Sequence, residues 1–228
     1  MFPTIVKEML QRTILIETKF NVGTGFCLDE NGLAGTCRHV IEDRNKQPVS
    51  EGIAHIPLFE KSSRILSYQQ CNWSIVRTDL LTDFALIQIE DIETKPIQMY
   101  EGIADIGEDI GMTGFPFAPD LKHTTTTKGI ISGYHPQPDI EGLLYQISEW
   151  LYEAGSGSPC YLANTGEVIG YMTEAYDPIK KLKRELEKKG IPVMDFAVFS
   201  GRKSFSALER PTNICWAMPI IRAWDAVR

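Results

Sequence analysis

Short apolar or β-branched runs, separated by turn signals, recur along most of this 228-residue chain. Thr13 to Asp29 contains a Gly-Thr-Gly kink, which predicts two strands joined at a bend. Asp29 to Gly32 has the composition of a hairpin turn and precedes a strand at Leu33 to Cys37. Further strands are expected at Ile53 to Ile56, Ile65 to Tyr68, Trp73 to Thr78, Phe84 to Ile89, Ile110 to Thr113, Thr124 to Ile131, Leu143 to Ser148, Cys160 to Ala163 and Val168 to Met172. Strands this short and this regularly spaced predict barrels or a sandwich and argue against alternating β and α units.

Two segments depart from the β pattern. Residues 177–190, DPIKKLKRELEKKG, begin with Asp-Pro, end with Gly and consist of helix formers, so they predict a charged surface helix. Residues 219–228 place Ile220, Ile221, Trp224 and Val227 at helical spacing, which predicts a closing amphipathic helix. The expected fold class is therefore all-β, with a helical insertion and a C-terminal helix.

Charge and cysteine usage narrow the class of partner. The sequence has 23 Lys and Arg against 30 Asp and Glu, and its formal net charge of -7 would repel a nucleic acid. Charged residues interrupt the apolar runs near the start, so neither a signal peptide nor a membrane span is visible. The five cysteines have neither metal-ligand spacing nor the pattern of a disulfide framework. We therefore expect a cytoplasmic protein that needs no metal or cofactor and binds neither nucleic acid nor a membrane.

Three local motifs contain, in chain order, a histidine, an aspartate and a serine. His39 follows a strand in GTGFCLDENGLAGTCRHVIED, Asp83 precedes an apolar strand in TDFALIQI, and Ser156 lies in the turn AGSGSPCY. Acyl transfer by a serine needs these groups, because an imidazole takes the hydroxyl proton and a carboxylate fixes the imidazole tautomer. Each motif alone is compatible with an ordinary turn, whereas the three in this order predict a catalytic triad.

The three motifs resemble the corresponding segments of chymotrypsin-like serine proteases, and the pattern is most similar to the high-temperature-requirement type. Four further segments resemble the same family: GEDIGMTGFPF, TTTTKGIISGY, NTGEVIGYMT and CWAMPI. The resemblance implies two antiparallel six-stranded Greek-key barrels, with His39 and Asp83 in residues 1–105 and Ser156 in residues 106–228. It also implies a serine endopeptidase that cleaves polypeptides through an acyl-enzyme intermediate.

Two serines compete for the position of the nucleophile. The family pattern has Gly directly after the nucleophile and Pro three residues after it, which selects Ser156 and leaves Ser158 as the alternative. The resemblance then assigns the oxyanion hole to the backbone of Ala154, Gly155 and Ser156. Ala154 departs from the family, where Gly is usual, and a Cβ at positive φ would cost roughly 1 kcal/mol or more. This departure favours a hole that is completed when a loop orders on binding a substrate or partner.

The substrate pocket is placed through the same resemblance. Five residues are implied to line it: Trp150, Thr173, Glu174, Ala175 and Ile214. Trp150 at the base and Ile214 opposite would leave an apolar slot, while Thr173 would offer its hydroxyl to the aspartate. Such a slot predicts cleavage after Val, Ala, Leu or a similar residue. Cleavage after Arg or Lys is the alternative, and it requires Glu149, Glu153 or Glu174 to turn inward.

Other functions fit parts of the sequence. A catalytically silent protease-fold module that binds peptides or partners is favoured by Ala154, but the presence of all three triad residues argues against it. A lipase or esterase of the α/β-hydrolase class needs the order Ser, Asp, His, whereas the order here is His, Asp, Ser. The β-rich sequence around Ser156 also lacks the strand-to-helix turn that carries the nucleophile in that class. The insertion at residues 176–210, between two strands of the expected pocket, is a candidate docking segment for a regulatory protein.

Overall fold

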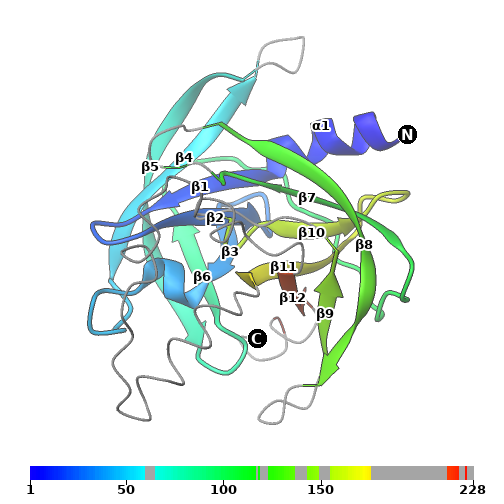
Figure 1. The fold of residues 1–228 in the computed structure, drawn as a ribbon. Coiled ribbons are helices and arrows are strands. Elements are labelled where there is room, and N and C mark those ends of the chain that lie inside the picture. Colours follow the sequence, from blue (N-terminus) through cyan, green and yellow to red (C-terminus); the bar gives the residue numbers. More distant parts are fainter. Residues whose placement is uncertain are drawn as a thin grey trace, which may run out of the picture.

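The chain folds into two closed antiparallel β-barrels, which lie side by side in Figure 1. The computed structural model describes residues 1–59, 65–116, 118, 123–136, 143–148, 155–175, 215–220 and 224. The first barrel comprises β1 (Thr13–Glu17), β2 (Val22–Cys27), β3 (Leu33–Cys37), β4 (Glu51–Phe59), β5 (Ile65–Asp79) and β6 (Phe84–Ile89). The second comprises β7 (Asp109–Gly114), β8 (Thr125–Pro136), β9 (Leu143–Ile147), β10 (Pro159–Leu162), β11 (Val168–Ala175) and β12 (Cys215–Pro219).

The two barrels share one topology. Around the first barrel the strands follow the order β1-β2-β3-β6-β5-β4, and around the second they follow the equivalent order β7-β8-β9-β12-β11-β10. In each barrel the third strand pairs with the sixth, which is a Greek-key connection. Closure pairs each of these strands with a neighbour on both sides. The predicted fold class, all-β with two six-stranded barrels, is confirmed.

Most strands lie where the sequence placed them, and β3 and β6 have the predicted limits. Two details differ. The turn between β1 and β2 is formed by residues 18–21, and the Gly-Thr-Gly kink lies inside β2. The two strands predicted at 65–68 and 73–78 are one 15-residue strand, β5, because the polar residues between them stay paired with β4: Gln69 with Ile56 and Gln70 with His55.

One helix was not predicted from the sequence. α1 (Phe2–Arg12) begins with Pro3 in its first turn and buries Ile5 and Met9. The helix predicted at residues 177–190 lies outside the described residues. Of the helix predicted at residues 219–228, three residues are described: Pro219 ends β12, and Ile220 and Trp224 are helical. Within the described ranges, no helix has the length and apolarity that a bilayer crossing requires.

The hydrophobic core continues from one barrel into the other. A single cluster of buried side chains includes Phe26, Phe84 and Trp73 of the first barrel together with Tyr161 and Tyr171 of the second. A separate cluster, centred on Ile110, Ile131, Tyr145 and Met172, fills the interior of the second barrel. The barrels are therefore packed against each other through apolar side chains, which fixes the surfaces that meet at their interface.

Candidate active site

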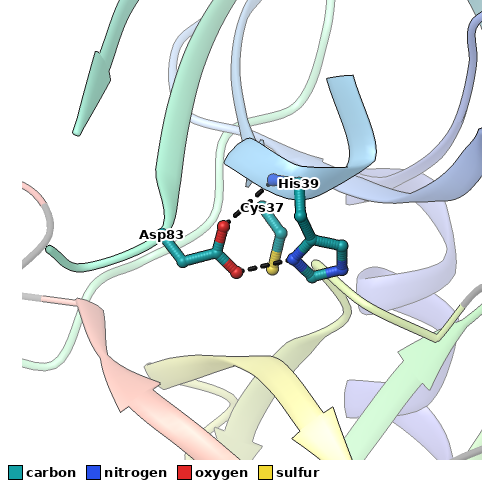
Figure 2. A group of neighbouring side chains, drawn as sticks. All are labelled: Cys37, His39 and Asp83. Atoms are coloured by element: carbon teal, nitrogen blue, oxygen red, sulfur yellow. Dashed lines mark hydrogen bonds and ion pairs between the residues drawn. The ribbon is translucent and has the colours of Figure 1, made fainter. Parts of the chain in front are cut away.

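His39 and Asp83 form a hydrogen-bonded pair at the edge of the first barrel. His39 lies in a short 3-10 helix, η1 (Arg38–Ile41), which follows β3, and Asp83 lies directly before β6 (Figure 2). The Nδ1 atom of His39 is 2.6 Å from Oδ2 of Asp83, and the backbone N–H of His39 donates to Oδ1 at 3.0 Å. An ionised carboxylate only accepts hydrogen bonds, so Nδ1 carries the proton and the lone pair of the neutral ring lies on Nε2. The His39 side chain is 42% exposed and thus accessible from solvent.

The backbone of Asp83 adopts a left-handed conformation, with φ of 54°. Asp is one of the few residues with a Cβ that tolerate this region. The backbone N–H of Arg38 donates to the Asp83 carbonyl oxygen at 2.8 Å, so main chain and side chain of Asp83 both bind the start of η1.

The carbonyl end of η1 is bound by Asn21, from the turn between β1 and β2. Its Nδ2 atom donates to the carbonyl oxygens of His39 at 3.2 Å and of Glu42 at 2.6 Å. Arg38 and Glu42 form an ion pair across the same turn, and both side chains are largely buried. These contacts satisfy carbonyl groups at the end of the helix and restrict the rotation of the peptide that carries His39.

The turn that carries Ser156 packs directly on β2. The backbone N–H of Thr24 donates to the Ser156 carbonyl oxygen at 2.8 Å. A Cβ at Gly23 would lie 2.5 Å from Val40 Cγ2 and 3.1 Å from the Ser156 carbonyl oxygen. Since Val40 follows His39, the contact at Gly23 brings the serine turn of the second barrel against the histidine segment of the first.

Ser158, the alternative nucleophile, is only 3% exposed. Its Oγ lies so close to Gly114 that a Cβ there would overlap it. Its backbone N–H donates to the Gly155 carbonyl oxygen at 3.0 Å and closes the turn. A buried hydroxyl facing the backbone of β7 is poorly placed to attack a substrate, which favours Ser156, a residue that is partly exposed.

The carbonyl group of Met172 on β11 joins the histidine segment to the serine turn. It accepts a hydrogen bond from the Cys37 thiol at 3.1 Å and another from the Gly157 backbone at 2.7 Å. Burial, with the negative charge of Asp83 as a second cause, raises the pKa of the Cys37 thiol well above its usual range. The Cys37 thiol therefore stays neutral and donates to Met172, and the side chain packs as a small apolar group. A thiol that stays protonated is a poor nucleophile.

Potential metal ligands do meet at this site. Among the described residues, the ligand atoms of Cys37, His39 and Asp83 lie within 4.8 Å of one another (Figure 2). A metal would need a thiolate and an imidazole nitrogen that carries no proton. Here the thiol stays protonated and donates to Met172, and Nδ1 binds Asp83, so the arrangement favours a hydrogen-bonded network over a metal centre.

The structure places only part of the predicted binding residues. Gly155 is buried in the serine turn, and Thr173 is half-buried on β11, where the register with β12 shifts between Met172 and Glu174. The backbone of β11 continues through Ala175. Three predicted residues lie outside the described residues: Trp150, Ala154 and Ile214. Their roles, and that of Thr173, stay predictions.

Several residues of the site were missed by sequence reasoning. Four residues bind the segments that carry the predicted triad: Asn21, Thr24, Met172 and Tyr171. Asn21 had a local signal, since its N–H donates to Thr18 Oγ1 in a tight turn. The others had none, because each binds a group that lies more than 80 residues away in the chain: Thr24 binds Ser156, Met172 binds Cys37 and Tyr171 binds Thr82.

Gly157 offers a test of this packing. It has φ of 85°, and a Cβ there would overlap the Thr24 carbonyl oxygen. We expect Gly157→Ala to lower the free energy of unfolding by at least about 2 kcal/mol, from backbone strain plus overpacking, and to abolish activity. Gly107→Ala is the matched control, because Gly107 has φ of 95° with no atom near its Cβ position, so only the strain of about 1 kcal/mol should remain. Equal losses of stability in the two variants, measured by denaturant unfolding, would contradict the packing argument.

Comparisons with known proteins agree with the two-barrel fold. A model of the trypsin-like peptidase domain matches residues 23–170, well over half of the chain. Among solved structures, the chain is similar to an inactive-form mutant of Rv3671c from M. tuberculosis H37Rv, with 16% identity and a TM-score of 0.64 over 98% of this chain and 88% of that one. It is also similar to the inactive form of the Rv3671c protease, with 16% identity and a TM-score of 0.65 over 98% and 90% of the two chains. Curated proteins gave no significant match. At this identity the structural likeness supports the fold, and the match over residues 23–170 settles the family: the chain belongs to the trypsin-like peptidase domains.

Proposed function

We propose that this peptidase-family chain is a serine endopeptidase in which Ser156 is the nucleophile, His39 the general base and Asp83 the residue that orients His39. The observation that carries the proposal is the bond of 2.6 Å between His39 Nδ1 and Asp83 Oδ2, next to a turn whose partly exposed serine packs against the histidine segment. The first barrel unit, residues 1–105, then supplies His39 and Asp83, and the second, residues 106–228, supplies Ser156.

The proposed reaction follows from the tautomer of His39. Because Nδ1–H is bound to Asp83, Nε2 accepts the proton of the Ser156 hydroxyl while Oγ bonds to the substrate carbonyl carbon. The protonated imidazole then gives that proton to the leaving amine as the C–N bond breaks, which leaves an acyl-enzyme. Water attacks the acyl-enzyme with His39 again as base, and the serine is regenerated. The backbone N–H groups of Ala154 and Ser156 are the proposed donors to the oxyanion.

A fluorophosphonate probe tests this assignment directly. We expect the protein to be labelled covalently and the Ser156→Ala variant to remain unlabelled, because the probe reacts only with a serine that a neighbouring base activates. Ser158→Ala should be labelled as the parent protein is. A folded parent protein that resists labelling would instead support the alternative, a catalytically silent module that binds peptides.

Regulation belongs to the same proposal. Ala154 stands where the family usually has Gly, so we propose that the oxyanion hole is completed by loop ordering when a polypeptide substrate or a regulatory protein binds. The insertion at residues 176–210 is the proposed docking segment. The cysteines whose side chains the structure describes form no disulfide, which supports our proposal that the protein works in a reducing compartment, the cytoplasm.

We expect the substrate residue before the scissile bond to be small and aliphatic, such as Val, Ala or Leu. The pocket implied by Trp150 and Ile214 is apolar, and burying an unpaired Lys or Arg there would cost several kcal/mol. Leu80 and Leu81, in the turn before Asp83, are 71% and 61% exposed and add apolar surface beside the site. A peptide library with mass-spectrometric mapping of the cleaved bonds measures the preference. Dominant cleavage after Arg or Lys, abolished when one of the glutamates Glu149, Glu153 or Glu174 is changed to Gln, would contradict the apolar pocket and leave the triad intact.

A further inference from the structure

The two peptide groups that flank Asp83 are each held by a hydrogen bond from a different part of the molecule. The Thr82 carbonyl, on the peptide before Asp83, accepts the hydroxyl proton of Tyr171 at 2.6 Å. The Asp83 carbonyl, on the peptide after it, accepts the backbone N–H of Arg38 at 2.8 Å. Tyr171 lies on β11 of the second barrel, whereas Arg38 begins the helix that carries His39. The second barrel thus binds the backbone of the aspartate that orients the histidine of the first.

These two bonds act on a strained residue. The rotation of a residue is fixed when the peptide planes on both sides are fixed, and Asp83 has φ of 54°, a region that is costly for residues with a Cβ. Asp79 supports the same turn, since its Oδ2 accepts from the Thr82 N–H at 2.6 Å and from Thr82 Oγ1 at 2.7 Å. Without the bond from Tyr171, the peptide between Thr82 and Asp83 would be free to rotate toward an unstrained conformation. The carboxylate would then turn away from His39.

Tyr171 is well placed to hold this peptide. Its ring is fully buried and packs against Phe84 and Phe26, with centroid distances of 5.1 and 6.3 Å. Burial, followed by electrostatic interaction with Cys37 and Asp83, raises the pKa of the Tyr171 hydroxyl well above its usual range. The hydroxyl therefore stays protonated and remains a donor at neutral pH.

We propose that Tyr171 is a positioning residue that holds Asp83 in the left-handed conformation needed to orient His39, so that alignment of the triad depends on docking of the second barrel against the first. This inference rests on the proposed function, in which the orientation of His39 matters for catalysis. Tyr171 touches neither the substrate nor His39 in this role and acts through the peptide between Thr82 and Asp83.

The test compares two buried tyrosines of the second barrel. Tyr171→Phe removes the hydroxyl and keeps the ring, and we expect kcat to fall about tenfold with KM unchanged, a loss of about 1.4 kcal/mol that is typical of one buried hydrogen bond. Tyr161→Phe is the matched control, because Tyr161 is equally buried and its hydroxyl bonds to Thr113 Oγ1 at 3.0 Å, away from Asp83. We expect its kcat to stay within twofold of the parent value. Equal falls in the two variants, or failure of Tyr171→Phe alone to fold, would overturn the proposal in favour of a purely structural role.

Two further measurements separate positioning from packing. In the Asp83→Ala background there is no carboxylate to orient, so adding Tyr171→Phe should not lower kcat further, and a second tenfold fall would overturn the proposal. The low-field proton NMR resonance of His39 Nδ1–H is recorded on the resting protein. We expect Tyr171→Phe to shift or broaden it and Tyr161→Phe to leave it unchanged, and an unchanged resonance in both would also overturn the proposal. Because this resonance needs no turnover, it tests the role of Tyr171 even in a protein that fails the fluorophosphonate test.

Discussion

Ser156→Ala and His39→Ala are each expected to lower kcat by about 10⁶-fold, and the double variant is expected to be no worse than either single variant. The two side chains act as one unit, since the hydroxyl is a poor nucleophile without a base and the base has no proton to take without the hydroxyl. KM should change little, because neither group contributes much to binding the substrate. Steady-state kinetics on a peptide identified from the library give all three values.

Two variants serve as controls for this series. Ser158→Ala changes a serine that is two residues away and buried against Gly114, and His135→Ala changes an exposed histidine on β8. Both should retain activity close to that of the parent protein. Additive losses in the Ser156→Ala/His39→Ala double variant would show that the two residues do not act together, and an inactive Ser158→Ala would transfer the nucleophile to that position.

Local chemistry explains how much of the fold could be predicted. Strands β3 and β6 have sharp limits because a turn or a polar residue stands at each end, and Gly32, at φ of 88°, marks the hairpin before β3. The limits of β5 were missed, since its run of polar residues resembles a turn until the pairing with β4 is known. α1 also had a local signal, with Pro3 at its start and Ile5 and Met9 on one face.

In the candidate site, too, residues in local motifs could be predicted and residues that act through distant contacts could not. His39, Asp83 and Ser156 could be predicted as a triad because each lies in a short motif, and the structure places His39 and Asp83 at hydrogen-bonding distance. The groups that bind these segments were not predicted, because their contacts involve main-chain carbonyl groups. Tyr171 donates to the carbonyl of Thr82, and the carbonyl of Met172 accepts from Cys37. A backbone contact leaves almost no trace in the sequence, because any residue supplies the same carbonyl group. Only the three-dimensional structure shows that β11 binds the segments of both barrels that carry the site.

Asp83→Asn is expected to lower kcat on the order of 10⁴-fold while leaving the fold intact. Asn tolerates the left-handed backbone as Asp does, so the conformation with φ of 54° should survive. The amide oxygen is expected to take the place of Oδ1, because the His39 backbone N–H needs an acceptor there, and this leaves the NH₂ group facing His39 Nδ1. Nδ1 must then accept a hydrogen bond, so the imidazole is driven to the tautomer with its proton on Nε2, which cannot accept the serine proton.

Asp91→Asn is the matched control for Asp83→Asn, because Asp91 is also left-handed, with φ of 51°, and lies just beyond the other end of β6, exposed to solvent. It should leave kcat and stability near the parent values, which would show that the loss at Asp83 comes from the carboxylate facing His39 and not from replacing an aspartate in this conformation. Nitrogen NMR of the labelled imidazole should report the Nε2–H tautomer in Asp83→Asn and the Nδ1–H tautomer in Asp91→Asn. A fall in kcat smaller than about tenfold in Asp83→Asn would contradict the role given to this residue, since a tenfold change is about 1.4 kcal/mol, less than the loss of a charge-assisted bond to a catalytic group.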